Sequence, residues 1–230
     1  EWVSSDTSPL LLSTTIRDML TMRTPFRSTT YRPLLDDNWA RTWFSAEPHH
    51  IPGTVFNYDT SASQVLCALV EKLTGMPILS FMENRLFSKI GMNGHKQWLQ
   101  DRSGTSQGGT GLIMTLRDFA LLTAFFASDG MGLISPDYLK AAVSRQTDTP
   151  LRAGREERNG YGYQVWRTRD GFSLYGMGGQ MGICMPGKGL VLCTLADTMK
   201  DEQGVQPIYD AFFEHLSHID TYPASPEDRK

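Results

Sequence analysis

The spacing of apolar residues changes from a helical to a strand-like period about two thirds of the way along the chain. Before residue 160, apolar positions recur at intervals of three and four, which is the period of an amphipathic helix. The clearest helix is predicted over residues 61–74, and it is followed by Gly75 and Pro77, residue types that commonly end helices. Further helices are predicted over residues 15–22, 77–90 and 115–126 and from residue 135 onward.

After residue 159, polar and apolar residues alternate, and glycines separate the apolar runs. Alternation is typical of strands, because successive side chains point to opposite faces of a sheet. Residues 205–216 return to the helical period and predict a helix that covers the sheet. The strands are predicted over residues 161–168, 172–177, 182–185 and 190–195, joined as an antiparallel meander.

The sequence therefore predicts an α+β fold in three parts. Residues 1–160 form a mainly helical region, residues 161–221 form the antiparallel sheet with its covering helix, and residues 222–230 form a flexible polar tail. A second irregular stretch, rich in Ser, Thr and Arg, is predicted as a loop over residues 23–32.

The amino-acid composition gives no indication that the chain binds nucleic acid or a membrane. The chain has 230 residues, of which 40% are hydrophobic and 20% charged, and its net charge is -3. These values are ordinary for a globular domain and give no basic surface for nucleic acid or anionic lipid. No apolar run reaches the roughly 18 residues that span a bilayer, so we expect no membrane segment and a cytoplasmic location. The spacing of Cys67, Cys184 and Cys193 indicates buried, reduced thiols.

The sequence gives little support for a metal site or for a phosphate-binding loop. The five histidines form no H-E-x-x-H motif, and we read His215 and His218 as polar-face residues of the last helix, so no metal and no cofactor are predicted. Residues 182–188 match G-x-x-x-x-G-K, but Gly189 replaces the Ser or Thr that would bind magnesium, and a strand follows. This segment is predicted to be a hairpin turn.

Residues 104–108 match G-x-S-x-G around Ser106, with Asp197 and then His215 or His218 following in the order of an α/β-hydrolase triad. A nucleophile elbow needs a buried strand before the Ser and a helix directly after it. Polar residues precede Ser106 and glycines follow it, so this site is kept only as an alternative.

The strongest catalytic candidate is a tyrosine beside the clearest helix. Residues 52–61 read P-G-T-V-F-N-Y-D-T-S, which places Tyr58 at the helix N-terminus. By position alone, Tyr58 could be a packing residue whose hydroxyl contacts water or backbone. Three further segments favour a catalytic role: T-I-R-D-M-L-T-M-R-T over residues 15–24, G-T-G-L-I-M-T-L-R-D over residues 109–118, and Y-G-M-G-G-Q over residues 175–180.

Together the four segments resemble the superfamily of serine β-lactamases, penicillin-binding proteins and related esterases and amide hydrolases. The resemblance implies a β-lactamase/transpeptidase-like fold and an acyl-enzyme mechanism without a cofactor. It implies that Tyr58 is the general base and acid and that the backbone N–H of Gln180 donates to an oxyanion. It also implies substrate contacts from Thr60, Met177, Gly178 and Gly179.

Two of these positions depart from the family pattern. Thr60 stands where Asn is usual, and Met177 stands where Lys or His binds a substrate carboxylate. Because a thioether cannot form a charged hydrogen bond, we expect a small, less anionic ester or amide as substrate. A helix N-terminus and an ammonium would lower the pKa of the phenol, and Tyr58 has only the helix.

The nucleophile of that family is absent. No Ser, Thr or Cys in this sequence is followed three residues later by Lys, so there is no Ser-x-x-K motif. In the family this motif precedes the segment matched by residues 15–24. We therefore expect the N-terminal part of the fold to be missing, with an open sheet edge that pairs with a companion N-terminal segment or another copy.

Two functional hypotheses remain. The leading one is a serine hydrolase of ester, amide or β-lactam-like substrates in its complete form, with this chain inactive on its own. The other is a non-enzymatic binding or interaction module that keeps the cleft without the nucleophile.

Overall fold

The structure is a computed structural model that describes residues 2–27, 36–216 and 219. The predicted tail, His218 and residues 28–32 of the predicted loop lie outside these ranges. The helices are α1 (Pro9–Leu12), α2 (Ile16–Leu20), α3 (Trp39–Phe44), α4 (Thr60–Thr74), α5 (Ile78–Met82), α6 (Leu116–Phe126), α7 (Pro136–Val143) and α8 (Gln206–His215). The strands are β1 (Gln97–Trp98), β2 (Leu112–Ile113), β3 (Trp166–Thr168), β4 (Gly171–Gly176), β5 (Gln180–Met185) and β6 (Leu190–Leu195).

The predicted helix over residues 61–74 is confirmed as α4, the longest helix of the structure. Asp59 caps its N-terminus, and Gly75 ends it with a left-handed φ of 69°. The segment that follows α5 is less regular than predicted, because a π-helical turn and a 3-10 turn continue it to Ile90. Short helices α1 and α3 were not predicted.

The helical region is held by a core between α2, α3 and α4. Met19, Trp43 and Val65 are buried there, together with Tyr161 and Trp166 from the sheet side. Thr15 caps α2 in a reciprocal capping box with Asp18. This core therefore ties the start of α4 to the strand region.

Thr115 forms only half of a capping box at the start of α6. Thr115 Oγ1 accepts a hydrogen bond from the Asp118 amide at 3.1 Å. The Asp118 carboxylate, however, lies 3.6 Å from Lys96 Nζ, and both side chains are buried. The Asp118 carboxylate thus pairs with a buried cation instead of completing the capping box.

The predicted antiparallel meander is confirmed, with strand order β3-β4-β5-β6. Its first strand is shorter than predicted, because only Trp166–Thr168 pairs with β4 while Tyr161 forms isolated bridges. The third strand begins two residues earlier than predicted, at Gln180. The match to G-x-x-x-x-G-K is confirmed as a hairpin turn, since Pro186–Lys188 joins β5 to β6.

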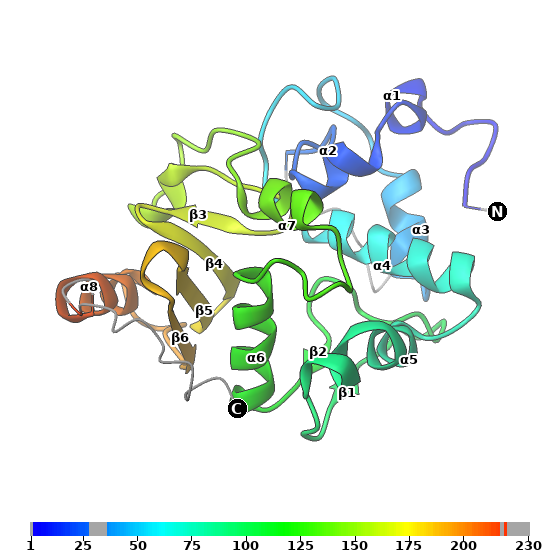
Figure 1. Cartoon of the computed structure of the whole chain (residues 1–230). Coiled ribbons are helices and arrows are strands. Elements are labelled where there is room, and N and C mark those ends of the chain that lie inside the picture. Colours follow the sequence, from blue (N-terminus) through cyan, green and yellow to red (C-terminus); the bar gives the residue numbers. More distant parts are fainter. Residues whose placement is uncertain (1, 28–35, 217–218, 220–230) are drawn as a thin grey trace.

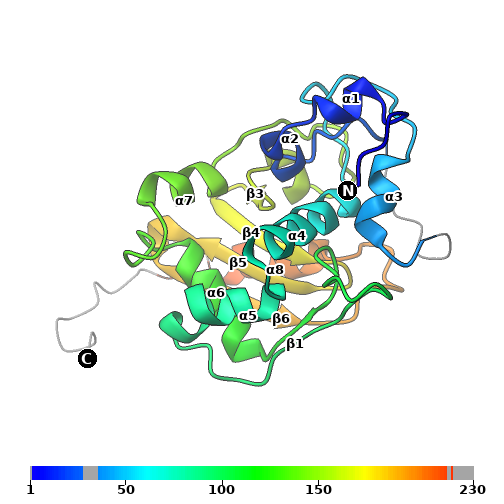
Figure 2. The ribbon, with the colours of Figure 1, turned by 90° about the vertical axis from the view of Figure 1, so that its right-hand side faces the viewer.

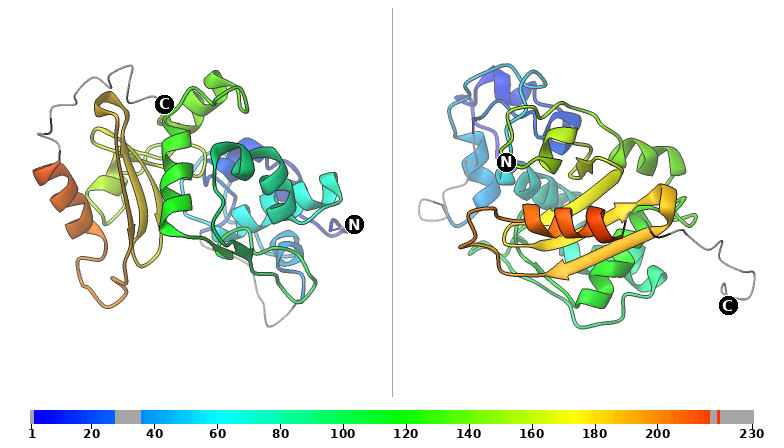
Figure 3. Two further views of the ribbon diagram at one scale, coloured as in Figure 1. Left: turned by 60° about the horizontal axis from the view of Figure 1, so that its bottom comes forward. Right: turned by 90° about the vertical axis from the view of Figure 1, so that its left-hand side faces the viewer.

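The sheet lies between two helical layers (Figures 1 and 3). On one face, Met181 and Ile183 of β5 pack with Tyr209 and Phe212 of α8, so α8 covers the sheet as predicted. On the other face α6 packs against β5 and β6, and α4 and α5 lie on the same side of the sheet (Figures 1 and 2). Figure 2 views the molecule from this side, with α4 and α6 in front of the strands and α8 behind them.

The described thiols are free, and those of Cys67 and Cys184 are buried. Of the helices that the structure describes, none alone has the length and apolarity to cross a membrane. One pair bent by 74°, Thr60–Thr74 with Ile78–Ile90, passes that test by length and composition.

Candidate active site

The Tyr58 segment is fixed at the start of α4 by its neighbour Asp59. The Asp59 side chain is fully buried and accepts hydrogen bonds from the Ser61 amide at 2.9 Å and from Thr24 Oγ1 at 3.0 Å. Burial raises the pKa of the Asp59 carboxyl, and the hydrogen bond from Thr24 opposes this rise. Asp59 is therefore a positioning residue that the sequence motif contained but did not single out.

An aromatic wall holds the Tyr58 ring. Tyr58 stacks on Trp166 with a centroid distance of 5.8 Å and an interplanar angle of 12°. Tyr161 lies edge-on to both rings, 6.3 Å from Tyr58 and 4.7 Å from Trp166. Such contacts fix the ring while 38% of the Tyr58 surface stays exposed.

Tyr58 lines a cavity of about 610 Å³ between α4, α6 and the sheet. The cavity also receives Gln180 from the start of β5, and apolar side chains of α6 such as Phe119 and Leu122 line another part of it. Among the described residues that line it, none has a charged side chain. The chain thus forms an apolar cleft whose polar side chains are phenols, amides and hydroxyls.

The environment keeps Tyr58 protonated at neutral pH. Burial raises the pKa of its phenol above the usual 10.0, and the nearby Tyr175 adds to the rise. The guanidinium of Arg152 lowers this pKa, while Glu157 raises it. Arg152, which also lies over the Trp166 ring at 5.2 Å, is the nearby cation that the motif search missed.

The Y-G-M-G-G-Q segment forms the turn between β4 and β5. Gly178 and Gly179 adopt left-handed φ values of 92° and 105°, which suit glycine. The Gly179 carbonyl accepts from Thr194 Oγ1 at 2.8 Å, and Gln180 Nε2 donates to the Ala196 carbonyl at 3.1 Å. The turn is therefore fixed to the end of β6.

The four predicted substrate contacts, Thr60, Met177, Gly178 and Gly179, lie outside the residues that line the cavity. Met177 is at the tip of the turn and is 76% exposed. Thr60 begins α4, and its methyl group would lie 2.3 Å from a Cβ added at Gly109, so the glycine loop packs directly on it. The structure brings Tyr58 and Gln180 to one cavity and leaves the four predicted substrate contacts beside it.

Two cleft residues were missed by the sequence analysis. Ser63 Oγ donates to Gln164 Oε1 at 2.6 Å, and both residues line the cavity. Gln164 has a φ of 59°, which is unusual for a residue other than glycine, and its side chain also donates to the Met19 carbonyl at 3.2 Å. Gln164 could have been noticed in the sequence, because it is a polar residue among the aromatic residues of positions 161–166.

Ser106 lies in a different setting. It is 1% exposed, its amide donates to Glu71 Oε2 at 3.2 Å, and its carbonyl accepts from Gln64 Nε2 at 3.0 Å. His215 lies on α8, across the sheet from α4 (Figure 1). Within the described ranges, the G-x-S-x-G segment therefore forms no triad with Asp197 and His215.

A scan of known families matches residues 2–214 to the Beta-lactamase model. The chain belongs to the beta-lactamase family. Its helices and antiparallel sheet have the β-lactamase/transpeptidase-like fold, as the sequence resemblance implied, and members of this family are hydrolases. No curated protein matches the chain.

Solved structures of this family superpose on most of the chain. A protein assigned as a beta-lactamase from Bacteroides dorei has a TM-score of 0.73 and 18% identity, over 96% of this chain and 76% of its own. One assigned as a 6-aminohexanoate-dimer hydrolase from Bacillus anthracis has a TM-score of 0.71 and 17% identity, over 89% of this chain and 61% of its own. An octameric penicillin-binding protein homologue from Pyrococcus abyssi has a TM-score of 0.61 and 16% identity, over 94% of this chain and 61% of its own. At these identities the likeness shows the fold.

Proposed function

We propose that the Tyr58 cleft binds a neutral ester or amide, which the complete protein hydrolyses through an acyl-enzyme. The observation that carries this proposal is the uncharged lining of the cavity around Tyr58. A substrate carboxylate buried there would lose its hydration without gaining a cation, which is costly. The exposed Met177 supplies no charge either. The name of the 6-aminohexanoate-dimer hydrolase among the structural neighbours agrees with an amide substrate.

In this proposal Tyr58 transfers the proton of the attacking hydroxyl and later returns it to the leaving group. Because its pKa is raised, the Tyr58 phenol is protonated at neutral pH in this chain and can act only as an acid. A cation brought near the phenol oxygen would favour the phenolate and complete the base. The backbone N–H of Gln180 stabilises the oxyanion. Thr60 supports the cavity from behind Gly109, and Gly178 and Gly179 form the turn that places Gln180.

We propose that a companion segment supplies the nucleophile, because this sequence contains no Ser-x-x-K. Strand β6 supports this idea, since in the described part of the chain no strand pairs with its outer edge. Beside β6 an apolar groove of about 440 Å³ is lined by Leu192, Ile208 and Phe212. A strand added at this edge would gain main-chain hydrogen bonds and cover the groove.

The test is hydrolysis of a chromogenic short-chain ester and a chromogenic cephalosporin by the chain, beside Tyr58→Phe and Ser106→Ala. We expect no turnover by any of the three. When the companion segment is added, the ester is cleaved by the chain and by Ser106→Ala, and Tyr58→Phe is slower by roughly 100-fold or more. Turnover by the chain alone that only Ser106→Ala removes would overturn the proposal in favour of Ser106.

The absent nucleophile also favours a second function, a binding module that keeps the cleft without chemistry. Ligand binding in the cleft with no hydrolysis in the presence of any Ser-x-x-K segment would support this function. Acylation of such a segment would exclude it.

A further inference from the structure

The Tyr58 cleft has an apolar part that the proton transfers at Tyr58 do not use. Its side chains come from α6, from the segment at β2 and from β4, and each of these residues is only partly buried. Ligand pockets commonly combine such a lining with a few polar groups that orient the ligand. The residues of this apolar part are Leu112, Met114, Phe119, Leu122, Phe126 and Leu174.

The pairing of β4 with β5 places the apolar part next to Gln180. A Cβ at Gly182 would lie 2.2 Å from Thr123 Oγ1, so α6 rests on β5 at this glycine. Leu174 is paired with Gly182, and Gly176 is paired with Gln180. Paired residues of antiparallel strands point to the same face, as do alternate residues of one strand. Leu174 therefore faces α6, and it lies about 7 Å along the sheet from Gln180.

Helix α6 forms the opposite wall of this apolar part. Phe119 lies about one turn before Thr123, and Phe126 lies about one turn after it. Because an α-helix rises 1.5 Å per residue, Phe119 and Phe126 are about 10 Å apart along the helix axis. The apolar wall is therefore long enough for an extended chain that starts at Gln180.

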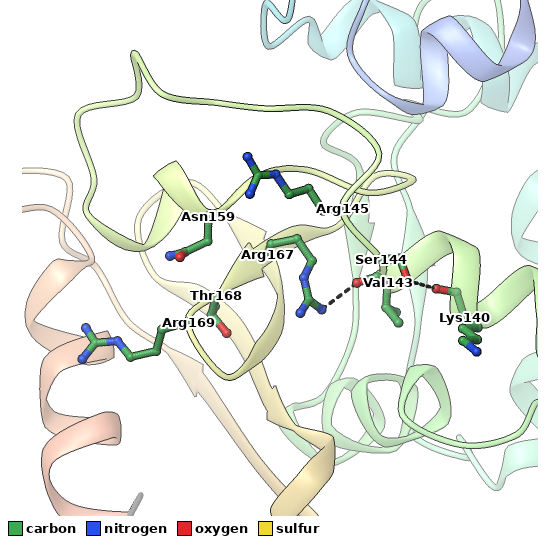
Figure 4. A pocket seen from close by; sticks show the side chains of 8 residues that line it. All are labelled: Lys140, Val143, Ser144, Arg145, Asn159, Arg167, Thr168 and Arg169. Atoms are coloured by element: carbon green, nitrogen blue, oxygen red, sulfur yellow. Dashed lines mark hydrogen bonds between the residues drawn. The ribbon is translucent and has the colours of Figure 1, made fainter.

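A packed cluster closes the far end of the apolar part. Phe126 packs against this cluster from the cleft. Val143 packs against the same cluster and lines a separate pocket, in which Arg167 Nη1 donates to the Val143 carbonyl at 2.7 Å (Figure 4). The two pockets share no lining residue, so the cations of the second pocket lie outside the cleft. The buried members of the cluster are Val165, Phe172 and Cys184.

We propose that the apolar part of the cleft binds an unbranched hydrocarbon chain of the substrate, attached on either side of the carbonyl group. This role rests on the neutral-substrate function proposed for the Tyr58 cleft. A chain that reaches from Gln180 to Leu174 spans about 7 Å, which is about six carbons with C–C bonds of about 1.5 Å. No charged side chain lines this part, so a charged end group would lose its hydration without a partner.

The test is NMR titration of the whole chain with butanamide, hexanamide, N-hexylacetamide and hexanoate. Hexanamide and N-hexylacetamide carry the chain on opposite sides of the carbonyl. Leu122→Trp fills the apolar part, and Leu122→Ala removes contacts without adding bulk. Ala124→Trp, at an exposed residue of the same helix, is the matched control. Thermal denaturation without ligand identifies the variants that are folded.

Because each buried methylene raises affinity about fourfold, we expect the better of the two six-carbon amides to bind about tenfold more tightly than butanamide. Leu122→Trp should remove this gain and Leu122→Ala should reduce it several-fold, with Ala124→Trp unchanged. Equal affinity for butanamide and both six-carbon amides, with shifts around Tyr58, would leave the apolar part to a protein segment and overturn this inference alone. The full gain in either Leu122 variant would also overturn it. Tighter binding of hexanoate, or no shift with any amide, would overturn the neutral-substrate function as well.

Discussion

Asp59 stabilises the segment that carries Tyr58 through hydrogen bonds that its side chain accepts from the Ser61 amide and from Thr24. Replacing Asp59 with Ala removes the cap of α4 and leaves Thr24 Oγ1 without its acceptor. We expect a loss of about 2 kcal/mol in the free energy of unfolding, measured by urea denaturation. Asp59→Asn keeps an acceptor oxygen for the Ser61 amide and should lose less. Equal losses in both variants would contradict the role given to the cap.

The Asp59 carboxyl should also make the free energy of unfolding depend on pH. Burial raises its folded-state pKa above the usual 3.8, so the folded chain binds this proton more tightly than the unfolded chain does. The associated stability is present at low pH and is lost as the pH rises through the folded-state pKa. We expect wild type to lose more stability than Asp59→Asn between about pH 4 and about pH 7, in denaturation curves at each pH. Parallel profiles would show that Asp59 is not responsible.

The reactivity of two buried cysteines reports how well the interior excludes solvent. Burial raises the pKa of Cys67 to about 12 and that of Cys184 to about 11. Because the thiolate is the reactive form, we expect neither thiol to react with Ellman's reagent in the native chain near pH 8. Both should react at once in denaturant. Fast native labelling of Cys67 would mean that α4 is less closely covered by the Gly108 loop than the structure has it.

At the scale of elements, α6 can pack closely on the sheet because Gly182 of β5 has no side chain. A Cβ at Gly182 would lie 2.2 Å from Thr123 Oγ1. We expect Gly182→Ala to destabilise the fold by about 1–3 kcal/mol in urea denaturation, because α6 would have to move. Gly187→Ala is the control, since a Cβ there meets nothing within 4 Å. A Gly182→Ala variant as stable as Gly187→Ala would contradict this packing.

Elements with strong periodicity could be predicted from the sequence. The helix predicted over residues 61–74 begins one residue earlier in the structure, and the strand over residues 190–195 has the predicted boundaries, because period and end signals agree there. The strand predicted over residues 161–168 is mostly irregular, since Gln164 turns back to α2 with a positive φ. Short helices such as α1 and α3 were missed because four to six residues are too few to show a period.

The site could be predicted in part. The motif identified Tyr58 and Gln180, which the structure brings to one cavity. Ser63 and Arg152 reach Tyr58 or its cleft only through tertiary packing, so no local pattern marked them. Gln164 was marked only as a polar residue among aromatic ones.

At the scale of the whole molecule, the edge of β6 should govern association. Without a companion strand, this edge is expected to pair with a second copy at high concentration, and the octameric neighbour is consistent with an oligomer. In sedimentation, Leu192→Glu should reduce association, and Leu73→Glu, on the exposed side of α4, should not. A monomer at every concentration would contradict an edge open to pairing.

The most direct test of the neutral-substrate cleft is NMR mapping of a short-chain amide and of its carboxylate analogue on the chain. Binding does not require the nucleophile, so this measurement separates recognition from chemistry. We expect the amide alone to shift the signals of Tyr58, Ser63, Trp166 and Gln180, with little effect of added salt. Tighter binding of the carboxylate, or shifts centred on Ser106, would contradict the account of this site.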